Sequence, residues 1–204
     1  MNLSNIKALT ASRRPRPAHA VLALFLIASL SLAFLAAIVP GASAAGTNYV
    51  LNGSFEKDAD FDGVPNNWTG FALSPADKRV CNQSYAGSCS FKFVGDGIEK
   101  QLHQTYSVSG FGGDKFRFSV WTKGKNIVNG VGAAAVSVNI YYTAGDPPYD
   151  YWFFTTPVGT TPWTLHKFTV TADRAYDAIS VIFQQYSAVT GKIWFDKAKL
   201  VPLP

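Results

Sequence analysis

The sequence contains very little glutamate and few charged residues of either sign. Glu56 and Glu99 are the only glutamates among its 204 residues, and charged side chains make up 15% of the chain. It contains no G-x-S-x-G nucleophile elbow, no H-E-x-x-H zinc motif and no glycine-rich phosphate loop that opens a helix. A glycosidase would need a pair of aspartates taken from turns, such as Asp146 and Asp150. A solvated turn around Pro147-Pro148 explains that pair better, so we expect a protein that is not an enzyme.

Basic residues are in excess only at the N-terminus. The formal net charge is +5, and Lys7, Arg13, Arg14 and Arg16 supply four of the 18 basic side chains. All 13 acidic residues follow this segment, so the remaining chain has 14 basic residues against 13 acidic ones and a net charge of +1. A nearly neutral domain without a basic run gives no electrostatic reason to expect a nucleic-acid partner.

Residues 1–44 have the pattern of an export leader. A basic start is followed by the apolar run Val21–Val39, the helix-breaking pair Pro40-Gly41 and the small-residue site Ala42-Ser43-Ala44. We expect cleavage there, which would leave residues 45–204 as a secreted or cell-surface domain. The apolar run is also long enough to span a bilayer, so an uncleaved anchor remains the alternative, and the leader would then be the only contact with the membrane.

Cys81 and Cys89 are the only cysteines. In an exported chain, a close and even pair of cysteines predicts a disulfide. The spacing is not Cys-x-x-Cys, and only His103 and His166 follow the leader, so a redox or metal role is disfavoured. We expect this disulfide to be structural.

After Tyr85 the chain follows a period of two in short runs that are separated by glycine-rich turns. In Phe116–Lys123 and again in Ala134–Tyr142, apolar residues alternate with polar or aromatic ones. Trp152–Thr155, Trp163–Thr171, Ala178–Tyr186 and Lys192–Leu200 supply four further predicted strands. Many short strands with regularly spaced turns predict an all-β sandwich.

An acidic loop follows a short strand that we expect at Val50 and Leu51. Asp58, Asp60 and Asp62 alternate and Gly63 follows, which is the opening half of a calcium loop. The twelfth position from Asp58 is Thr69, where an EF-hand would have a bidentate glutamate, so the motif is incomplete. The loop is therefore either a calcium site or an ordinary solvated turn.

Four motifs, in their order along the chain, resemble those of carbohydrate-binding modules of the four, nine and twenty-two type. They are NGSFE with DGVPNNW at 52–68, SYAGSCSFKF at 84–93, FRFSVWTKG at 116–124 and GKIWFDKAKL at 191–200. This resemblance implies that residues 45–204, behind the leader helix, form a jelly-roll β-sandwich of two antiparallel sheets. It also implies a glycan chain bound in a cleft on the concave sheet, and a structural calcium ion at positions matching Glu56 and Asp196.

Aromatic and polar side chains that share one strand face are the candidate sugar-binding groups. Sugars combine flat C–H faces with a ring of hydroxyls, so a binding site needs aromatic platforms beside hydrogen-bonding groups. Such pairs are Trp121 with Arg117, Tyr141 with Asn139, and Tyr186 with Gln184. Tyr149, Tyr151 and Trp152 form a possible second platform, whereas we assign Trp68, Trp163 and Trp194 to the core.

Two functions therefore fit the sequence. The first is a non-catalytic carbohydrate-binding domain with structural calcium. The second is a structural or adhesive surface protein that uses the same sandwich to bind a protein partner or to self-assemble. Fold resemblance alone does not separate them, because sandwiches of this type host many ligands.

Overall fold

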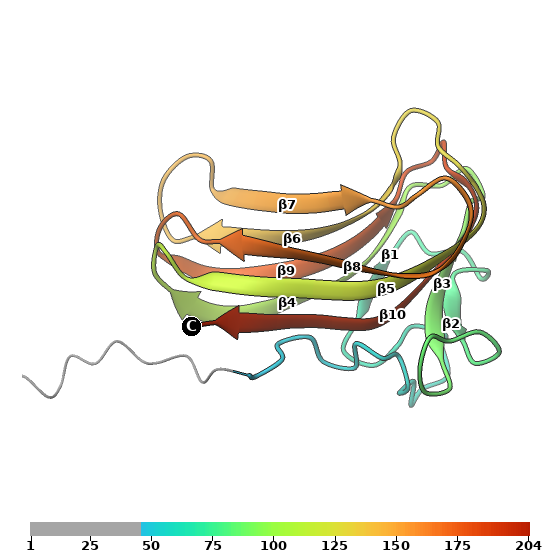
Figure 1. The fold of residues 1–204 in the computed structure, drawn as a ribbon, viewed down its shortest axis with the longest axis horizontal. Helices are drawn as coiled ribbons and strands as arrows, with labels where there is room; N and C mark the ends of the chain where they lie inside the picture. Colours follow the sequence, from blue (N-terminus) through green and yellow to red (C-terminus); the bar gives the residue numbers. More distant parts are fainter. Residues whose placement is uncertain (1–45) are drawn as a thin grey trace, which may run out of the picture. The chain divides into compact units, whose positions relative to one another are not determined.

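The computed structural model describes residues 46–204, which form an all-β domain of ten strands (Figure 1). The strands are β1 (Thr69–Phe71), β2 (Lys78–Val80), β3 (Ser90–Val94), β4 (Lys100–Gly110), β5 (Lys115–Val128), β6 (Ala134–Tyr142), β7 (Tyr149–Thr155), β8 (Gly159–Thr171), β9 (Tyr176–Gln185) and β10 (Thr190–Leu203). Within this part of the chain, no helix has the length and apolar character needed to cross a membrane. The predicted leader helix and its cleavage site lie outside the described residues.

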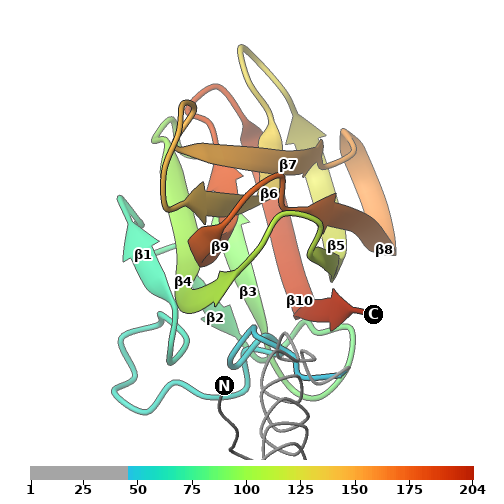
Figure 2. The same cartoon turned by 90° about the vertical axis from the view of Figure 1, so that its left-hand side faces the viewer.

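The strands form two five-stranded antiparallel sheets packed as a sandwich. Sheet A has the order β1-β4-β9-β6-β7, and sheet B has the order β2-β3-β10-β5-β8. Figure 2 shows the edge strands β1 and β8 at opposite sides of the domain. The predicted jelly-roll sandwich of two antiparallel sheets is confirmed.

The alternation in β6 shows why these residues form a sandwich. Val136, Val138 and Ile140 are fully buried, while Ser137 and Asn139 between them face outward. Side chains point to opposite faces of a strand with period two, so each strand contributes one face to the core and one to the exterior. The outer faces of the strands are therefore where functional side chains can lie.

Aromatic side chains from both sheets fill the core. Phe183 of β9 stacks on Phe195 of β10 with ring centroids 4.5 Å apart and planes inclined by 5°, and this contact joins the two sheets. Phe55 and Trp68 from the N-terminal segment pack against Phe183 at centroid distances of 6.2 and 5.0 Å. Each such pair contributes about 0.5 to 1.5 kcal/mol beyond the burial of its surface.

The N-terminal segment runs along β10 before it reaches β1 (Figure 1). The amide of Tyr49 donates to the carbonyl of Leu200, and the amide of Ala198 donates to the carbonyl of Gly53. Position 53 requires glycine, because a Cβ there would lie 2.1 Å from the Ala198 carbonyl oxygen. The motif at 52–56 therefore ties the start of the domain to its last strand.

The disulfide between Cys81 and Cys89 is present, as predicted. It closes a loop that covers part of the outer face of sheet B, where Tyr85 stacks on Trp121 with centroids 3.6 Å apart. Trp68 belongs to the core as predicted. Trp194 is buried, but it alternates with Ile193 and Phe195 of the core and so faces outward.

The assignment of Trp163 to the core is wrong. This side chain is half-buried on β8 and meets the ring of Tyr85 at a centroid distance of 6.2 Å. Leu165 lies opposite Trp121 of β5, so Leu165 and Trp163, two residues apart, share the outer face of sheet B. Trp163 therefore lies outside the core cluster and beside the Trp121 and Tyr85 stack.

Candidate functional site

A pocket of about 550 Å³ lies on the outer face of sheet A. Strands β4, β6, β7 and β9 and the loop before β6 supply its walls. Its lining residues are Gln101, Gly132, Ala133, Ala135, Ser137, Asn139, Tyr149, Tyr151, Phe153, Thr155, Ile182, Gln184 and Tyr186. None of these side chains carries a charge.

Three aromatic side chains on the edge strand β7 form one wall of the pocket, and we call Tyr149, Tyr151 and Phe153 the aromatic ladder. They are 41%, 60% and 57% exposed. Their ring centroids are 6.4 and 5.9 Å apart in succession. The spacing of two residues places all three on the outer face, while Trp152 and Phe154 pack against the core. An exposed apolar edge strand promotes association, so its presence suggests a binding role.

Polar side chains form the floor beside the aromatic ladder. Asn139 of β6 lies between Tyr151 of β7 and Ser180 of β9 in the strand register. The hydroxyl of Ser180 donates to the Tyr141 hydroxyl oxygen at 3.2 Å. Asn139 lines the pocket, and its Oδ1 atom is buried without a hydrogen-bond partner among residues 46–204, so the side-chain amide has unused hydrogen-bonding capacity.

Gln184 on β9 has a fixed orientation. Its Nε2 donates to Oε1 of Glu99 at 2.8 Å. Because a carboxylate only accepts hydrogen bonds, this contact assigns the amide nitrogen to Glu99 and leaves the Gln184 carbonyl oxygen on the other side. The floor therefore offers the amide groups of two residues, Asn139 and Gln184, to a ligand.

Tyr186 forms the rim of the pocket opposite the aromatic ladder. The loop before β6 packs against its ring, and a Cβ at Gly132 would lie 2.7 Å from the ring carbon Cγ. Gly132 also has a φ of +100°, which L side chains rarely adopt. Glycine at this position lets the loop approach the ring and hold it at the rim.

Five of the predicted ligand-binding residues share this outer face. Asn139, Tyr149, Gln184 and Tyr186 line the pocket, and the Tyr141 ring lies against that of Tyr149, tilted by 42° at a centroid distance of 5.6 Å. Sequence reasoning did not include Phe153 in the platform, although its spacing of two residues from Tyr151 is a signal that finds it.

The structure does not bring the other three predicted residues to this pocket. Trp152 lies on β7 but points to the opposite side, against the core. Arg117 and Trp121 lie on β5, which belongs to sheet B. The Trp121 ring is covered by Tyr85, so its face is already occupied within the protein.

The aspartates at the Pro-Pro turn do not form a free pair. Oδ2 of Asp150 accepts a hydrogen bond from the Tyr142 hydroxyl at 2.7 Å. Burial raises the pKa of the Tyr142 hydroxyl above its ordinary value, and the bond to Asp150 raises it further. Asp150 therefore serves to hold Tyr142, and it faces away from the aromatic ladder along β7.

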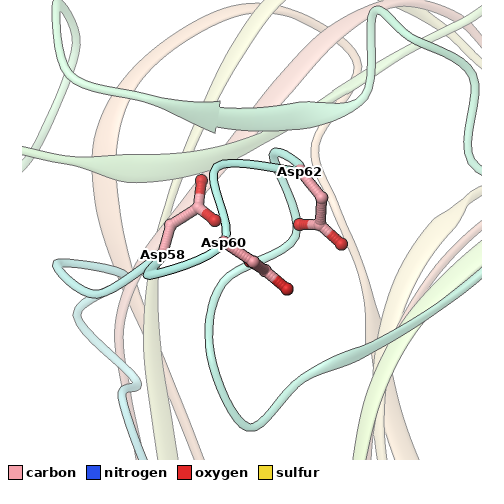
Figure 3. Close-up of side chains that lie close together, drawn as sticks. All are labelled: Asp58, Asp60 and Asp62. Carbon is pink, nitrogen blue, oxygen red and sulfur yellow. The ribbon is translucent and has the colours of Figure 1, made fainter.

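The acidic loop gathers its three carboxylates as the sequence predicts (Figure 3). One oxygen each from Asp58, Asp60 and Asp62 lies within 4.8 Å of the others. Calcium binds oxygen at about 2.3 to 2.6 Å, so oxygens at this separation can share one ion. Oδ1 of Asp62 also accepts the Val64 amide at 2.7 Å. The chemistry and spacing of this loop fit calcium, and calcium binding there stays a prediction.

The second expected calcium position has a different arrangement. Oε1 of Glu56 accepts the amides of Ser88 and Cys89 at 2.9 and 3.3 Å. Oδ2 of Asp196 accepts the amides of Tyr85 and Ala86 at 2.8 and 3.1 Å. These carboxylates anchor the disulfide loop through its amide hydrogens, so an ion would have to compete with that anchor.

A basic side chain, that of Arg79, binds the backbone beside Glu56. The Arg79 guanidinium donates to the backbone carbonyls of Phe55 and Glu56, both at 2.7 Å. Burial raises the pKa of the Asp196 carboxyl above its usual value, against the lowering effect of the amide hydrogen bonds that it accepts. The arrangement around Glu56 and Asp196 therefore fits a metal-free anchor better than a calcium site, and the prediction at this pair is untested.

No family model matches the chain, and no curated protein matches it. Solved structures do. A tailspike protein of bacteriophage CBA120 aligns with a TM-score of 0.57 and 18% identity over 76% of this chain, which spans 21% of the tailspike chain. A family 61 carbohydrate-binding module in complex with β-1,4-galactotriose aligns with a TM-score of 0.52 and 16% identity, covering 77% of this chain and 99% of the module.

A larger enzyme chain aligns as well. A Clostridium thermocellum xylanase chain that holds a family 22 binding module and a family 10 catalytic module, solved with xylohexaose, aligns over part of its length with a TM-score of 0.53 and 16% identity. The match covers 78% of this chain and 29% of the xylanase chain. The protein thus has the jelly-roll fold of carbohydrate-binding modules, and at these identities the similarity establishes the fold.

Proposed function

We propose that the protein is a secreted or outward-anchored, non-catalytic carbohydrate-binding domain that holds an uncharged glycan chain in the sheet A pocket. The observation that supports this most directly is the aromatic ladder of Tyr149, Tyr151 and Phe153, exposed beside a polar floor. Flat sugar faces pack on aromatic rings, and sugar hydroxyls pair with amide groups. Successive rings along β7 would contact successive sugar units of one chain.

The chemistry of the floor favours a neutral ligand. The lining side chains are amides, hydroxyls and apolar groups, without lysine, arginine or carboxylate. An acidic sugar would lose hydration there without gaining a counter-charge. Asn139 and Gln184 both line the pocket with uncharged amide groups, which suit the hydroxyl groups of a neutral sugar. The two neighbours solved with galactotriose and xylohexaose carry neutral oligosaccharides, which agrees with this class of ligand.

Binding without cleavage follows from the same lining. Glycoside hydrolysis generally uses two carboxylic acid groups that flank the bond. The Glu99 carboxylate accepts a hydrogen bond from the lining residue Gln184, so it already has a partner within the protein. The proposal therefore assigns no catalytic residue.

Calcium belongs to the proposal as a structural ion at Asp58, Asp60 and Asp62. These residues lie in the loop before β1, away from the pocket lining, so the ion would stabilise that loop without touching the glycan. Thermal unfolding in calcium and in EDTA tests this point. A melting temperature that does not change between the two conditions would remove the ion from the proposal.

A binding screen with the full chain in mild non-ionic detergent tests the function. The chain is titrated with soluble and insoluble neutral polysaccharides, and Tyr151→Ala is compared with Tyr85→Ala. Tyr85 is a matched control, because it is also an exposed tyrosine but stacks on Trp121 over sheet B. We expect Tyr151→Ala to weaken binding about tenfold, the loss of about 1.4 kcal/mol that a central aromatic contact supplies, and Tyr85→Ala to have no effect.

Two results would contradict the proposal. The first is a folded chain that binds no polysaccharide in a broad panel. The second is binding that is lost in Tyr85→Ala and retained in Tyr151→Ala, which would move the site to Trp121 on sheet B.

A further inference from the structure

The outer face of sheet B carries lysines in neighbouring strands at matching positions. Lys78 of β2 lies directly opposite Lys92 of β3. Lys92 in turn lies opposite Trp194 of β10, whose other neighbour is Lys123 of β5. Directly opposed residues of antiparallel strands point to the same face, so these side chains form one row across four strands.

A second row lies beside the first. Lys192 precedes Trp194 by two residues and therefore shares its face, and it lies opposite Lys125 of β5. Ile193 and Phe195 take the inner face of β10, so both rows point outward. We call the following set the lysine face: Lys78, Lys92, Lys123, Lys125 and Lys192.

The acidic loop of Asp58, Asp60 and Asp62 approaches the lysine face at the edge strand β2, where the Arg79 amide donates to the Gly63 carbonyl, but in the described part of the chain it forms no ion pair with the five lysines. Within residues 46–204, the ion pairs are those of Lys100 with Asp77 and Asp96, and none involves the lysine face. Asp77 precedes Lys78 in sequence, but its carboxylate is buried and bonded to Lys100. Asp196 shares the outer face of β10, and its oxygens accept loop amides.

This arrangement opposes folding. Like charges directly opposite each other destabilise a sheet, and both Lys78–Lys92 and Lys192–Lys125 are such pairs. Partial burial lowers the pKa of the Lys92 ammonium below its ordinary value, and the charges of Lys192 and Lys78 lower it further, while the charge of Asp77 opposes this shift. A repulsive cluster that packing does not explain points to an anionic ligand.

A hollow of about 310 Å³ lies at the second row. Its lining is Val94, Gly95, Lys125, Asn126, Gly191 and Lys192. Gly191 has a φ of +89°, and a Cβ there would lie 2.3 Å from the Asn126 carbonyl oxygen, so the chain approaches closely at this point. The hollow is thus flanked by two lysines and has room for one anionic group.

We propose that the lysine face is a second binding surface and that it takes an acidic polysaccharide, with one anionic group of the polymer in the hollow between Lys125 and Lys192. Neighbouring strands are about 4.8 Å apart, so the rows present positive charge at short, regular intervals to a linear polyanion. The neutral pocket of sheet A and this charged surface belong to opposite faces of the sandwich.

The composition of the surface favours an acidic glycan over a nucleic acid. The five basic residues are all lysines, which act as point charges, whereas arginine provides the bidentate geometry that phosphate recognition exploits. The one aromatic residue in the rows, Trp194, is 8% exposed and offers no platform for stacking bases. A flat sheet face also lacks an element that enters a DNA groove.

The test compares one polymer in charged and uncharged forms. The full chain in non-ionic detergent is titrated with polygalacturonate and with its fully methyl-esterified form. We expect binding to polygalacturonate alone. It should weaken at least about tenfold between about 50 and 200 mM salt, as counterion release at three or more lysines requires.

Variants locate the binding. The combined change Lys92→Gln, Lys125→Gln and Lys192→Gln should weaken binding to polygalacturonate at least about tenfold. Lys115→Gln is the matched control, an exposed lysine on the same outer face at the far end of β5, and should leave binding unchanged. The triple variant should melt at the same temperature as the parent or higher, because it removes like-charge pairs. That melt confirms that any loss is not due to unfolding.

Several outcomes would overturn the inference. One is equal affinity for the charged and esterified polymers, and another is unchanged affinity in the triple variant. Preference for DNA or for phosphatidylserine vesicles over polygalacturonate would replace the ligand class. Loss of polygalacturonate binding in Tyr151→Ala would place the polymer in the sheet A pocket instead.

Discussion

Removal of the Asp77 carboxylate should destabilise the domain more than any surface change. Asp77 accepts hydrogen bonds at 2.7 Å from the Lys100 ammonium and from both the amide and the hydroxyl of Ser74, and at 2.8 Å from the Val94 amide. The side chains of Lys100 and Asp77 are both 0% exposed. Asp77→Ala would therefore leave a buried ammonium with Asp96 and one backbone carbonyl as partners.

The magnitude follows from the cost of removing one partner of a buried ion pair. Breaking a buried ion pair costs about 3 to 5 kcal/mol, against a total stability of about 5 to 15 kcal/mol for a domain. For a domain of this size, each kcal/mol corresponds to about 2 to 4 °C, so we expect the melting temperature to fall by about 6 to 20 °C. Thermal unfolding followed by circular dichroism measures this shift.

Two comparisons make the result interpretable. Asp96→Ala removes the other carboxylate from the same ammonium, but the Asp96 side chain is 27% exposed, so its loss should cost clearly less. The double change Asp77→Leu with Lys100→Met removes both buried charges and should recover much of the stability. If Asp77→Ala and Asp96→Ala shift the melting temperature equally, the argument from buried charge is refuted.

Three further changes should have effects of known direction. Gly132→Ala requires a φ of +100° from an L residue and brings its Cβ to 2.7 Å from Tyr186, so we expect a loss of about 1 to 3 kcal/mol in urea unfolding together with weaker glycan binding. Burial lowers the pKa of the His166 imidazole below its unfolded value, so its contribution to stability is present above about pH 6.5 and is lost as the pH falls through the folded pKa. Unfolding curves across this range should show the loss, and His166→Gln should flatten it. Reduction of Cys81–Cys89, which are eight residues apart, should cost about 2 to 3 kcal/mol while the sheets persist, as chemical denaturation with and without dithiothreitol can measure.

The fold was predictable because its signals are local. The alternation of Val136, Val138 and Ile140 with polar residues identifies a half-exposed strand without any knowledge of its neighbours. The disulfide was also predictable, because Cys81 and Cys89 are the only cysteines and lie close together in the sequence. Such features depend on residues that are near each other in the chain, so the sequence contains all that is needed to find them.

The site was only partly predictable, because sheet membership is not local. Trp121 and Tyr141 each alternate with apolar residues in consecutive strands, yet β5 and β6 belong to different sheets. Only the hydrogen-bonded order of the strands shows that Tyr141 lies beside the pocket and that Trp121 is covered by Tyr85. The choice of Trp152 over Phe153 has a simpler cause. The prediction grouped Trp152 with Tyr149 and Tyr151 as the aromatic residues that follow the Pro-Pro turn, whereas the period of two places Trp152 inward and Phe153 outward.

The lysine face illustrates the same limit for charge. A net charge of +1 after the leader indicates no basic surface when it is read as a total. The register of β2, β3, β5 and β10 brings lysines from positions 78 to 192 together, while carboxylates such as Asp77 turn inward. A total charge reports composition, whereas binding of a polyanion depends on the distribution of charge over one face.

The two outer faces should respond differently to salt because their chemistry differs. The sheet A pocket is lined by uncharged side chains, so screening has little to act on and affinity there should depend weakly on ionic strength. Binding at the lysine face releases counterions and should weaken steeply as salt increases. The inward-facing side chains of both sheets form one shared core. The two outer surfaces are therefore built from separate sets of residues. Ionic strength can therefore separate the two binding activities within a single molecule, without any mutation.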